Sequence, residues 1–225
     1  YAGGPVQVGQ GISDVADQLR ELNLQIDEAG LYEIRMASDD FDTVLSLKRN
    51  DVDMNNDDAN GSDSMITAYL QPGQYPLLAD GFSGQMGGQY TLDVVRRTVP
   101  SGVEVAMPGT LTLGQENRYY YTGQPVTYQL EVPAGRMLRV DMTSTDFDSV
   151  LNLSGNGLDV TDDDGGDMLN ARLHAVVPAG TYALQARSAG TGAGVFTLKT
   201  DMVDVPADAG GGTLAIGQTR SARLY

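Results

Sequence analysis

An eight-residue motif occurs twice in this chain, and this repeat constrains the fold more than any other feature. The sequence Asp-Phe-Asp-Thr-Val-Leu-Ser-Leu spans residues 40–47, and Asp-Phe-Asp-Ser-Val-Leu-Asn-Leu spans residues 146–153, at an offset of 106 residues (146 − 40). An acidic run follows each copy at the same offset, over residues 56–58 and 162–164. A repeated unit of about 100 residues has the size of a protein domain. We therefore expect two tandem domains.

Apolar and polar residues alternate through both repeats. The alternation is clearest over residues 22–26 and 32–36 in the first repeat and over residues 128–132 and 138–142 in the second. A period of two predicts half-buried antiparallel strands, and the Gly-, Pro- and Asp-rich segments between them predict turns. The predicted fold class is all-β, with two tandem antiparallel β-sandwich domains of jelly-roll-like form.

The repeat also sets the domain bounds. We place the first β-sandwich at residues 1–99 and the second at residues 106–203. Residues 204–225 hold a Gly/Ala/Asp linker and then, over 212–218, a segment that resembles the opening strand of a third repeat. Either a longer array continues there, or this last strand packs on an edge of the sheets already formed.

The charge of the chain excludes several partners. It has 14 Lys and Arg against 30 Asp and Glu, for a formal net charge of −16. A protein that follows a nucleic-acid backbone needs a basic face, so no nucleic-acid partner is expected, and anionic membrane surfaces are disfavoured for the same reason. No apolar run is long enough to span a membrane. The chain has no Cys, which excludes disulfides and a thiolate nucleophile.

The order of the short motifs resembles that of the bacterial pre-peptidase C-terminal domain. In the second repeat this order is Val-Pro-Ala-Gly, Asp-Phe-Asp-Ser-Val-Leu, Asp-Asp-Asp-Gly-Gly, Pro-Ala-Gly-Thr-Tyr and Gly-Val-Phe-Thr-Leu. The resemblance covers roughly residues 20–97 and 126–200, and the first copy departs from it in its acidic loop and at residues 71–73. It implies a non-catalytic β-sandwich attached to secreted bacterial enzymes, often peptidases. It also implies a relation to the calcium-stabilised collagen-binding modules of collagenases.

The clustered Asp residues predict a structural Ca²⁺ site, because Ca²⁺ takes six to eight oxygen ligands and carboxylates supply them. The motif carboxylates flank a Phe, so both are expected to point away from the ring and toward the acidic loop. Neither loop has the glycine and glutamate of an EF-hand. The alternative is that these are solvated turn residues. Their charge would then keep the protein soluble through mutual repulsion, or would be an adaptation to a salty habitat. The candidate ligands are Asp40, Asp42, Asp57, Asp58 and Asp63 in the first repeat and Asp146, Asp148, Asp162, Asp163, Asp164 and Asp167 in the second.

No residue set predicts catalysis, so we do not expect an enzyme. His174 is the only histidine, and Thr67 takes its place in the first repeat. A Ser-His-Asp triad or a zinc site would depend on this one side chain. Paired carboxylates could serve a hydrolase, but carboxylates repeated in tandem loops suit a structural device better.

Tyrosines are the remaining candidates for ligand binding. Tyr119, Tyr120 and Tyr121 form a run with no counterpart in the first repeat, and tyrosine rings can stack on sugars or on collagen-like peptides. The alternative is that they fill sheet faces. Tyr75 and Tyr182 occupy matching positions, and we expect both to be core or corner residues.

The sequence therefore favours a non-catalytic accessory module of a secreted or cell-surface bacterial protein, with the periplasm as a further location. It would stabilise or target an attached or associated secreted enzyme and bind Ca²⁺. The alternative is a module that binds an extracellular polymer, polysaccharide or fibrous protein, through an aromatic surface. An acidic hydrolase is the third interpretation.

Overall fold

The computed structural model describes residues 5–49, 52–133, 136–190 and 192–205. Its contacts divide the chain into two compact units, residues 1–100 and 101–225. The described ranges contain no α-helix, and thus none that could cross a membrane; a 3-10 turn at Phe82–Gly84 is their one helical element. The expected third-repeat strand over 212–218 lies outside the described residues.

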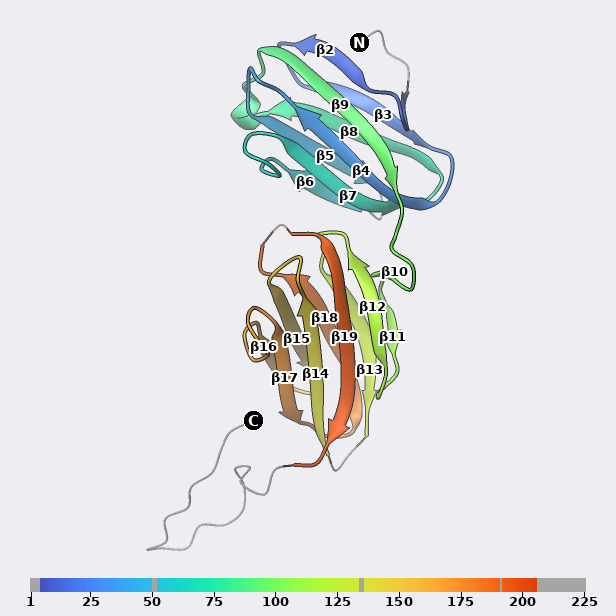
Figure 1. Ribbon diagram of the computed structural model, residues 1–225, viewed down its shortest axis with the longest axis vertical. Helices are drawn as coiled ribbons and strands as arrows, with labels where there is room; N and C mark the ends of the chain where they lie inside the picture. Colours follow the sequence, from blue (N-terminus) through green and yellow to red (C-terminus); the bar gives the residue numbers. More distant parts are fainter. Residues whose placement is uncertain (1–4, 50–51, 134–135, 191, 206–225) are drawn as a thin grey trace, which may run out of the picture. The chain divides into compact units, whose positions relative to one another are not determined.

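Unit 1 is a sandwich of two sheets (Figure 1). One sheet has the order β1-β3-β8-β5-β6, and the other has the order β2-β9-β4-β7. The strands are β1 (Val6–Gln7), β2 (Ile12–Ala16), β3 (Arg20–Ile26), β4 (Gly30–Ala37), β5 (Thr43–Arg49), β6 (Val52–Asn56), β7 (Ser64–Leu70), β8 (Gly73–Gly81) and β9 (Gly88–Arg97).

Unit 2 has two sheets of the same kind, in the orders β11-β13-β18-β15-β16 and β10-β12-β19-β14-β17. The strands are β10 (Glu104–Val105), β11 (Gly109–Leu111), β12 (Glu116–Tyr121), β13 (Val126–Val132), β14 (Met137–Ser144), β15 (Ser149–Gly155), β16 (Leu158–Asp162), β17 (Ala171–Val176), β18 (Gly180–Ser188) and β19 (Gly194–Val203).

The all-β sandwich predicted from the alternation is confirmed. The order β3-β8-β5-β6 in unit 1 corresponds to β13-β18-β15-β16 in unit 2, and β2-β9-β4-β7 corresponds to β12-β19-β14-β17. The pairing is antiparallel except at the edges, where the short strands β1, β10 and β11 run parallel to β3, β12 and β13. These edge pairs are one difference from the predicted antiparallel sheets.

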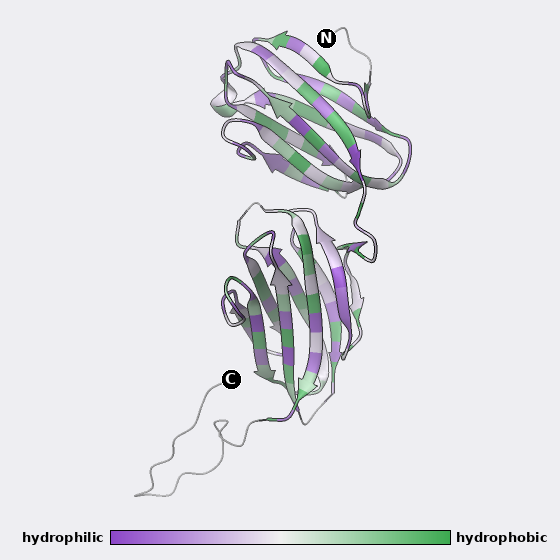
Figure 2. Ribbon diagram, in the orientation of Figure 1, coloured by the Kyte–Doolittle hydropathy of each residue, from purple (hydrophilic) through white to green (hydrophobic). Residues whose placement is uncertain are grey.

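The core of each unit lies between its two sheets. Along the strands, buried apolar residues alternate with polar ones, which Figure 2 shows as alternating bands. The motif contributes Leu45 and Leu47 in unit 1 and Leu151 and Leu153 in unit 2, all without exposed surface. Phe41 and Phe147 pack against the same cores and are only partly buried. The motif is thus a core anchor in both units, as its apolar positions predict.

Tyr75 and Tyr182 tie a turn to the start of the following strand. The Tyr75 hydroxyl donates to the Gln71 carbonyl (3.0 Å) and accepts the Gln71 N–H (3.0 Å). The Tyr182 hydroxyl donates to the Pro178 carbonyl (2.9 Å), and both rings are buried. The corner role expected of these two tyrosines is therefore found in both units.

Tyr128 is also buried, in the core of unit 2, but its hydroxyl is not hydrogen-bonded as those of Tyr75 and Tyr182 are. Its ring stacks on Tyr119 with a centroid distance of 5.7 Å. The hydroxyl is enclosed and has no hydrogen-bond partner among the described residues. Burial raises the pKa of this phenol far above its ordinary value, so it stays neutral. An enclosed hydroxyl without a partner costs free energy, because it has lost its water.

These two environments predict opposite effects for one substitution. Tyr182→Phe removes a made hydrogen bond and should lower the free energy of unfolding by about 1 kcal/mol. Tyr128→Phe removes only the unpartnered oxygen and should leave stability unchanged or raise it by up to about 1 kcal/mol. Urea unfolding of both variants measures the difference, and equal losses in the two would contradict the assignment.

Candidate functional site

The loop that carries the repeated motif begins with a serine that holds it in place. In unit 1, Ser38 Oγ donates to the Gln89 carbonyl of β9 (2.7 Å) and accepts the Asp40 N–H (3.1 Å). In unit 2, Ser144 Oγ donates to the Val195 carbonyl of β19 (2.8 Å) and accepts the Asp146 N–H (3.0 Å). The same bonds in both units fix the loop to the neighbouring strand.

The first carboxylate of each motif bonds to the same strand. Asp40 Oδ2 accepts the Gln89 N–H and Asp146 Oδ2 accepts the Val195 N–H, both at 2.7 Å. A glycine precedes each of these amides, and a Cβ on Gly194 would lie 2.4 Å from the Asp146 Cβ. These carboxylates therefore close a structural contact, whereas we expected them to point toward the acidic loop.

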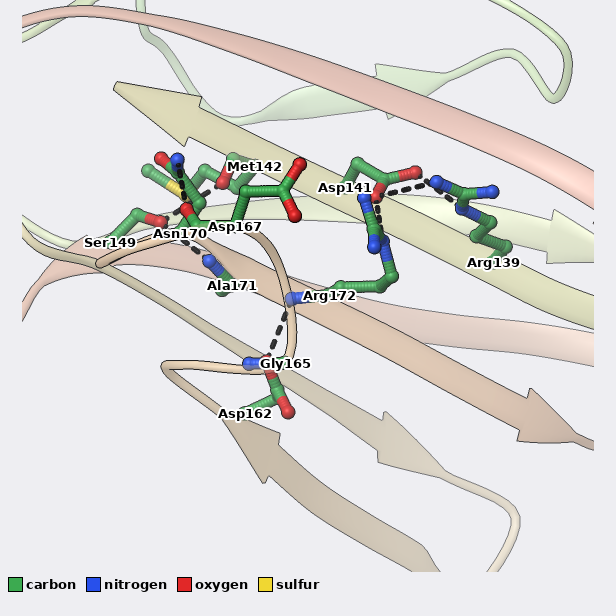
Figure 3. A network of polar contacts seen from close by, with 10 residues as sticks. All are labelled: Arg139, Asp141, Met142, Ser149, Asp162, Gly165, Asp167, Asn170, Ala171 and Arg172. Atoms are coloured by element: carbon green, nitrogen blue, oxygen red, sulfur yellow. Dashed lines mark hydrogen bonds and ion pairs between the residues drawn. The ribbon is translucent and has the colours of Figure 1, made fainter. Parts of the chain in front are cut away.

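The hydroxyl that ends the Asp-Phe-Asp-Ser/Thr segment joins the two sheets. Thr43 Oγ1 on β5 accepts the Ser64 N–H of β7 (2.8 Å) and donates to the Met36 carbonyl of β4 (3.2 Å). Ser149 on β15 repeats the arrangement with Ala171 of β17 (2.8 Å) and Met142 of β14 (3.0 Å), as Figure 3 shows. Both side chains are completely buried. Sequence analysis took this position only as a marker of the repeat.

The second carboxylate of each motif is half-buried. Asp42 Oδ1 and Asp148 Oδ1 are enclosed and have no hydrogen-bond partner among the described residues. Within the described residues, neither lies with two other carboxylates in a group that could hold an ion. The recurrence of this arrangement in both units marks it as part of the shared loop.

Some carboxylates of the acidic loops bond to other groups of the protein. Asp162 Oδ1 accepts the N–H groups of Gly165 (2.9 Å) and Arg172 (2.7 Å) and so closes the loop after β16. Asp63 pairs with Arg35 at 2.6 Å. Asp57 is half-buried, whereas the side chains of Asp58, Asp163, Asp164 and Asp167 are exposed.

These carboxylates do not form a calcium cage in this arrangement. Within the described ranges, no three Asp, Glu or His side chains come together where one ion could contact them all. Ca²⁺ needs six to eight oxygens at about 2.3–2.6 Å. The structure therefore assigns no ligand set, and calcium binding stays a prediction of the sequence.

His174 lies on the outer face of β17, opposite Arg139 of β14. Burial, and then the charges of Arg139 and Arg172, lower its pKa below the ordinary 6.5, so the ring is neutral at pH 7. The described part of the chain gives this ring no hydrogen bond.

The tyrosine run on β12 does not present three rings on one surface. Tyr121 is buried and packs on Phe147, with centroids 5.1 Å apart. Tyr119 packs on Tyr128 and Phe196. Only Tyr120 takes the outer face, because side chains of a strand alternate. The aromatic binding surface expected over residues 119–121 is therefore reduced to one half-buried ring.

A charged cluster that the sequence analysis missed lies on the outer face of β14 and β17 (Figure 3). Asp141 is 9% exposed and accepts hydrogen bonds from Arg139 Nε (2.7 Å), Arg139 Nη2 (3.1 Å) and Arg172 Nε. Burial, the largest influence, raises the pKa of Asp141, but the bonds from Arg139 and then Arg172 outweigh it and hold this pKa below its ordinary value. The sequence could have indicated this pair. Arg139 and Asp141 are separated by one residue in a predicted strand, so their side chains share one face of it.

The cluster borders a shallow groove of about 310 Å³. Lys199 and Asp201 of β19 and Glu116 of β12 line it together with the cluster, and two threonine hydroxyls complete the wall. Within the described chain, this groove brings together more formal charges than the hollows beside the two motif loops.

Comparison with known proteins gives structural likeness alone. No protein-family model matches the chain, and no curated protein matches it. The pre-peptidase C-terminal domain of a collagenase from Bacillus anthracis is similar over 46% of this chain and 99% of its own, at 12% identity and a TM-score of 0.37. The CUB1-EGF-CUB2 region of human MASP-1/3 is similar over 85% of this chain and 98% of its own, at 7% identity and a TM-score of 0.28. At these TM-scores the β-sandwich assignment rests on the sheets described above.

The ion pairs of Asp141 predict a pH-dependent loss in Asp141→Asn. The folded-state pKa is depressed, so the carboxylate contributes stability above its unfolded pKa of about 3.9, and this is lost as pH falls through the folded value. At pH 7 the substitution should lower the free energy of unfolding by about 2 kcal/mol, and below about pH 3 the gap should narrow. Urea unfolding at several pH values measures this.

The exposed Asp163 gives the control, since Asp163→Asn removes one carboxylate that has no bond within the described chain. Its effect should be small at every pH. A loss at Asp141→Asn that did not change between pH 7 and pH 3 would contradict the ionic assignment.

Proposed function

We propose that this chain is a non-catalytic accessory segment of a secreted or cell-surface bacterial protein, and that it stabilises or targets an attached enzyme. The order of motifs that resembles the pre-peptidase C-terminal domain supports this role. The proposal extends to both units, because the strand orders correspond.

The observation that carries the proposal is that the polar residues of the repeated loop form hydrogen bonds within the protein. Ser38, Asp40 and Thr43, and their counterparts in unit 2, bond to backbone groups of neighbouring strands. A catalytic side chain must keep a donor or acceptor for its substrate. These three residues and their counterparts instead use their polar groups to hold each sandwich together, which is what a rigid carrier needs.

A fusion experiment tests the accessory role. The full chain would be joined to a reporter peptidase and compared with the reporter alone and with the reporter joined to an unrelated β-sandwich of similar size. We expect slower thermal inactivation of the reporter, or its retention on an insoluble extracellular polymer, only with this chain. The chain by itself should show no turnover of peptide or glycoside substrates. Turnover that persisted in His174→Ala and in EDTA would favour the hydrolase interpretation instead.

Calcium binding is a separate part of the proposal and has its own measurement. An ion that binds only the folded state raises the melting temperature once its concentration exceeds the dissociation constant. We expect a higher melting temperature in Ca²⁺ on the order of 1 mM than in EDTA, the range in which extracellular modules bind. A Mg²⁺ sample of equal ionic strength is the control, and equal melting in all three would sink the calcium prediction.

A further inference from the structure

The charged groove of unit 2 is ordered by strand register. Glu116 lies opposite Lys199 across β12 and β19, Lys199 lies opposite Asp141 across β19 and β14, and Asp141 lies opposite Arg172 across β14 and β17. One row thus crosses four strands with alternating charge. Arg139 and Asp201 are opposite each other in the next outward-facing row.

Unit 1 builds the same sheet without this row. By register, Arg35 takes the place of Asp141, with Asp93 at the Lys199 position and Met65 at the Arg172 position. Glu33 takes the place of Arg139. Val95 takes the place of Asp201 by the same register. Three charges are therefore inverted and two are absent, whereas the serine and aspartate bonds of the motif recur. Arg35 and Asp93 face each other with the signs reversed. The sandwich therefore does not require the charges that unit 2 has in this row, and they are available for another role.

The cations of the groove keep donors for a ligand. Asp141 engages Arg172 through Nε alone and Arg139 through Nε and Nη2, so each guanidinium retains further N–H groups. Lys199 is exposed, and its ammonium group has no ion pair or hydrogen bond within the described chain. With Asp141 engaged by both arginines, three cations and the carboxylates of Glu116 and Asp201 face the groove.

This mixture of groups defines the chemistry of the occupant. An arginine fork and a lysine bind a carboxylate well. Glu116 and Asp201 only accept hydrogen bonds, so they suit hydroxyl donors, and Thr143 and Thr197 provide hydroxyls that donate or accept. Asp201 already accepts the Met202 N–H through Oδ1 (2.9 Å) and keeps Oδ2 for a ligand. A simple oxyanion would leave the Glu116 carboxylate without a donor, and a neutral sugar would leave the cations without a counter-charge. The groove is open and about 310 Å³, near the lower size of ligand sites, which fits one ring of an extended chain.

We propose that this groove binds a hexuronate unit of an acidic polysaccharide, with the sugar carboxylate on Lys199 and the two guanidiniums and the ring hydroxyls on Glu116 and Asp201. The site is specific to unit 2 and does not use the tyrosine run. It stands independently of the accessory role, since a ligand site is compatible with any attached protein.

The test measures binding to the full chain by calorimetry at about 0.15 M salt, where remote surface charges are screened. The probes are galacturonate and mannuronate trimers, the neutral galactose trimer and inorganic sulfate. We expect saturable binding of at least one uronate trimer and none of the neutral trimer or of sulfate. Lys199→Gln should weaken that binding about tenfold, because it removes a charge-assisted hydrogen bond. Lys199→Asp, which installs the unit 1 residue, should abolish it.

The control is Arg136→Gln, which makes the same charge change. Arg136 lies outside the groove and pairs with the exposed Asp204 at 3.4 Å. The Arg136→Gln variant should bind the trimer as the wild type does. The melting temperatures of Lys199→Gln and the wild type should agree, since the Lys199 ammonium bonds to no group of the described chain. The proposal is overturned by no uronate binding at millimolar concentration, by equal binding of sulfate or the neutral trimer, or by equal weakening in Arg136→Gln and Lys199→Gln. This experiment measures binding and not the behaviour of an attached enzyme. Failure of the reporter-fusion test of the accessory role would therefore not change its outcome.

Discussion

A buried hydroxyl joins the two sheets of each unit, and the surrounding loop depends on it. Thr43 and Ser149 stand on one sheet and bond to backbone groups of two strands in the other. A β-sandwich is otherwise held by apolar contacts, which have no direction. A hydrogen bond across the core has direction, so it fixes which strand segments face each other. The adjoining Asp-Phe-Asp segment is then held at one end by this bond and at the other by Ser38 or Ser144.

The sequence predicts most of this fold because the period of a strand is local. Alternation over 32–36 and 138–142 marks the buried positions, and Met36 and Met142 are fully buried as expected. The repeat predicts that one architecture serves twice. The parallel edge strands β1, β10 and β11 are harder to foresee, since two or three residues carry no pattern. Tertiary contacts, and not the local sequence, decide which strand each of them pairs with.

The candidate site is less predictable because its contacts are distant in sequence. Asp40 bonds to Gln89 and Asp146 to Val195, 49 residues away in each case. A carboxylate that accepts a backbone N–H from a remote strand has the same sequence appearance as one that waits for an ion. The Tyr119–Tyr121 run shows a simpler failure. Three aromatics in a row look like a surface, but alternation sends the first and third into the core, where Phe147 and Phe196 receive them.

The duplication provides an internal comparison that a single domain lacks. A residue that recurs with the same bonds in both units is explained by what the units share, which is the sandwich itself. Asp146 and Ser149 belong to this class, and their acidity or polarity is no sign of a ligand. Asp141 belongs to the other class, because Arg35 replaces it in an equivalent sheet. Its burial beneath two arginines costs desolvation, and its side chain, at 12% exposed, is less accessible than the Asp63 and Glu33 carboxylates of unit 1. The difference between the units therefore directs attention away from the acidic loops and toward the outer face of β14 and β19.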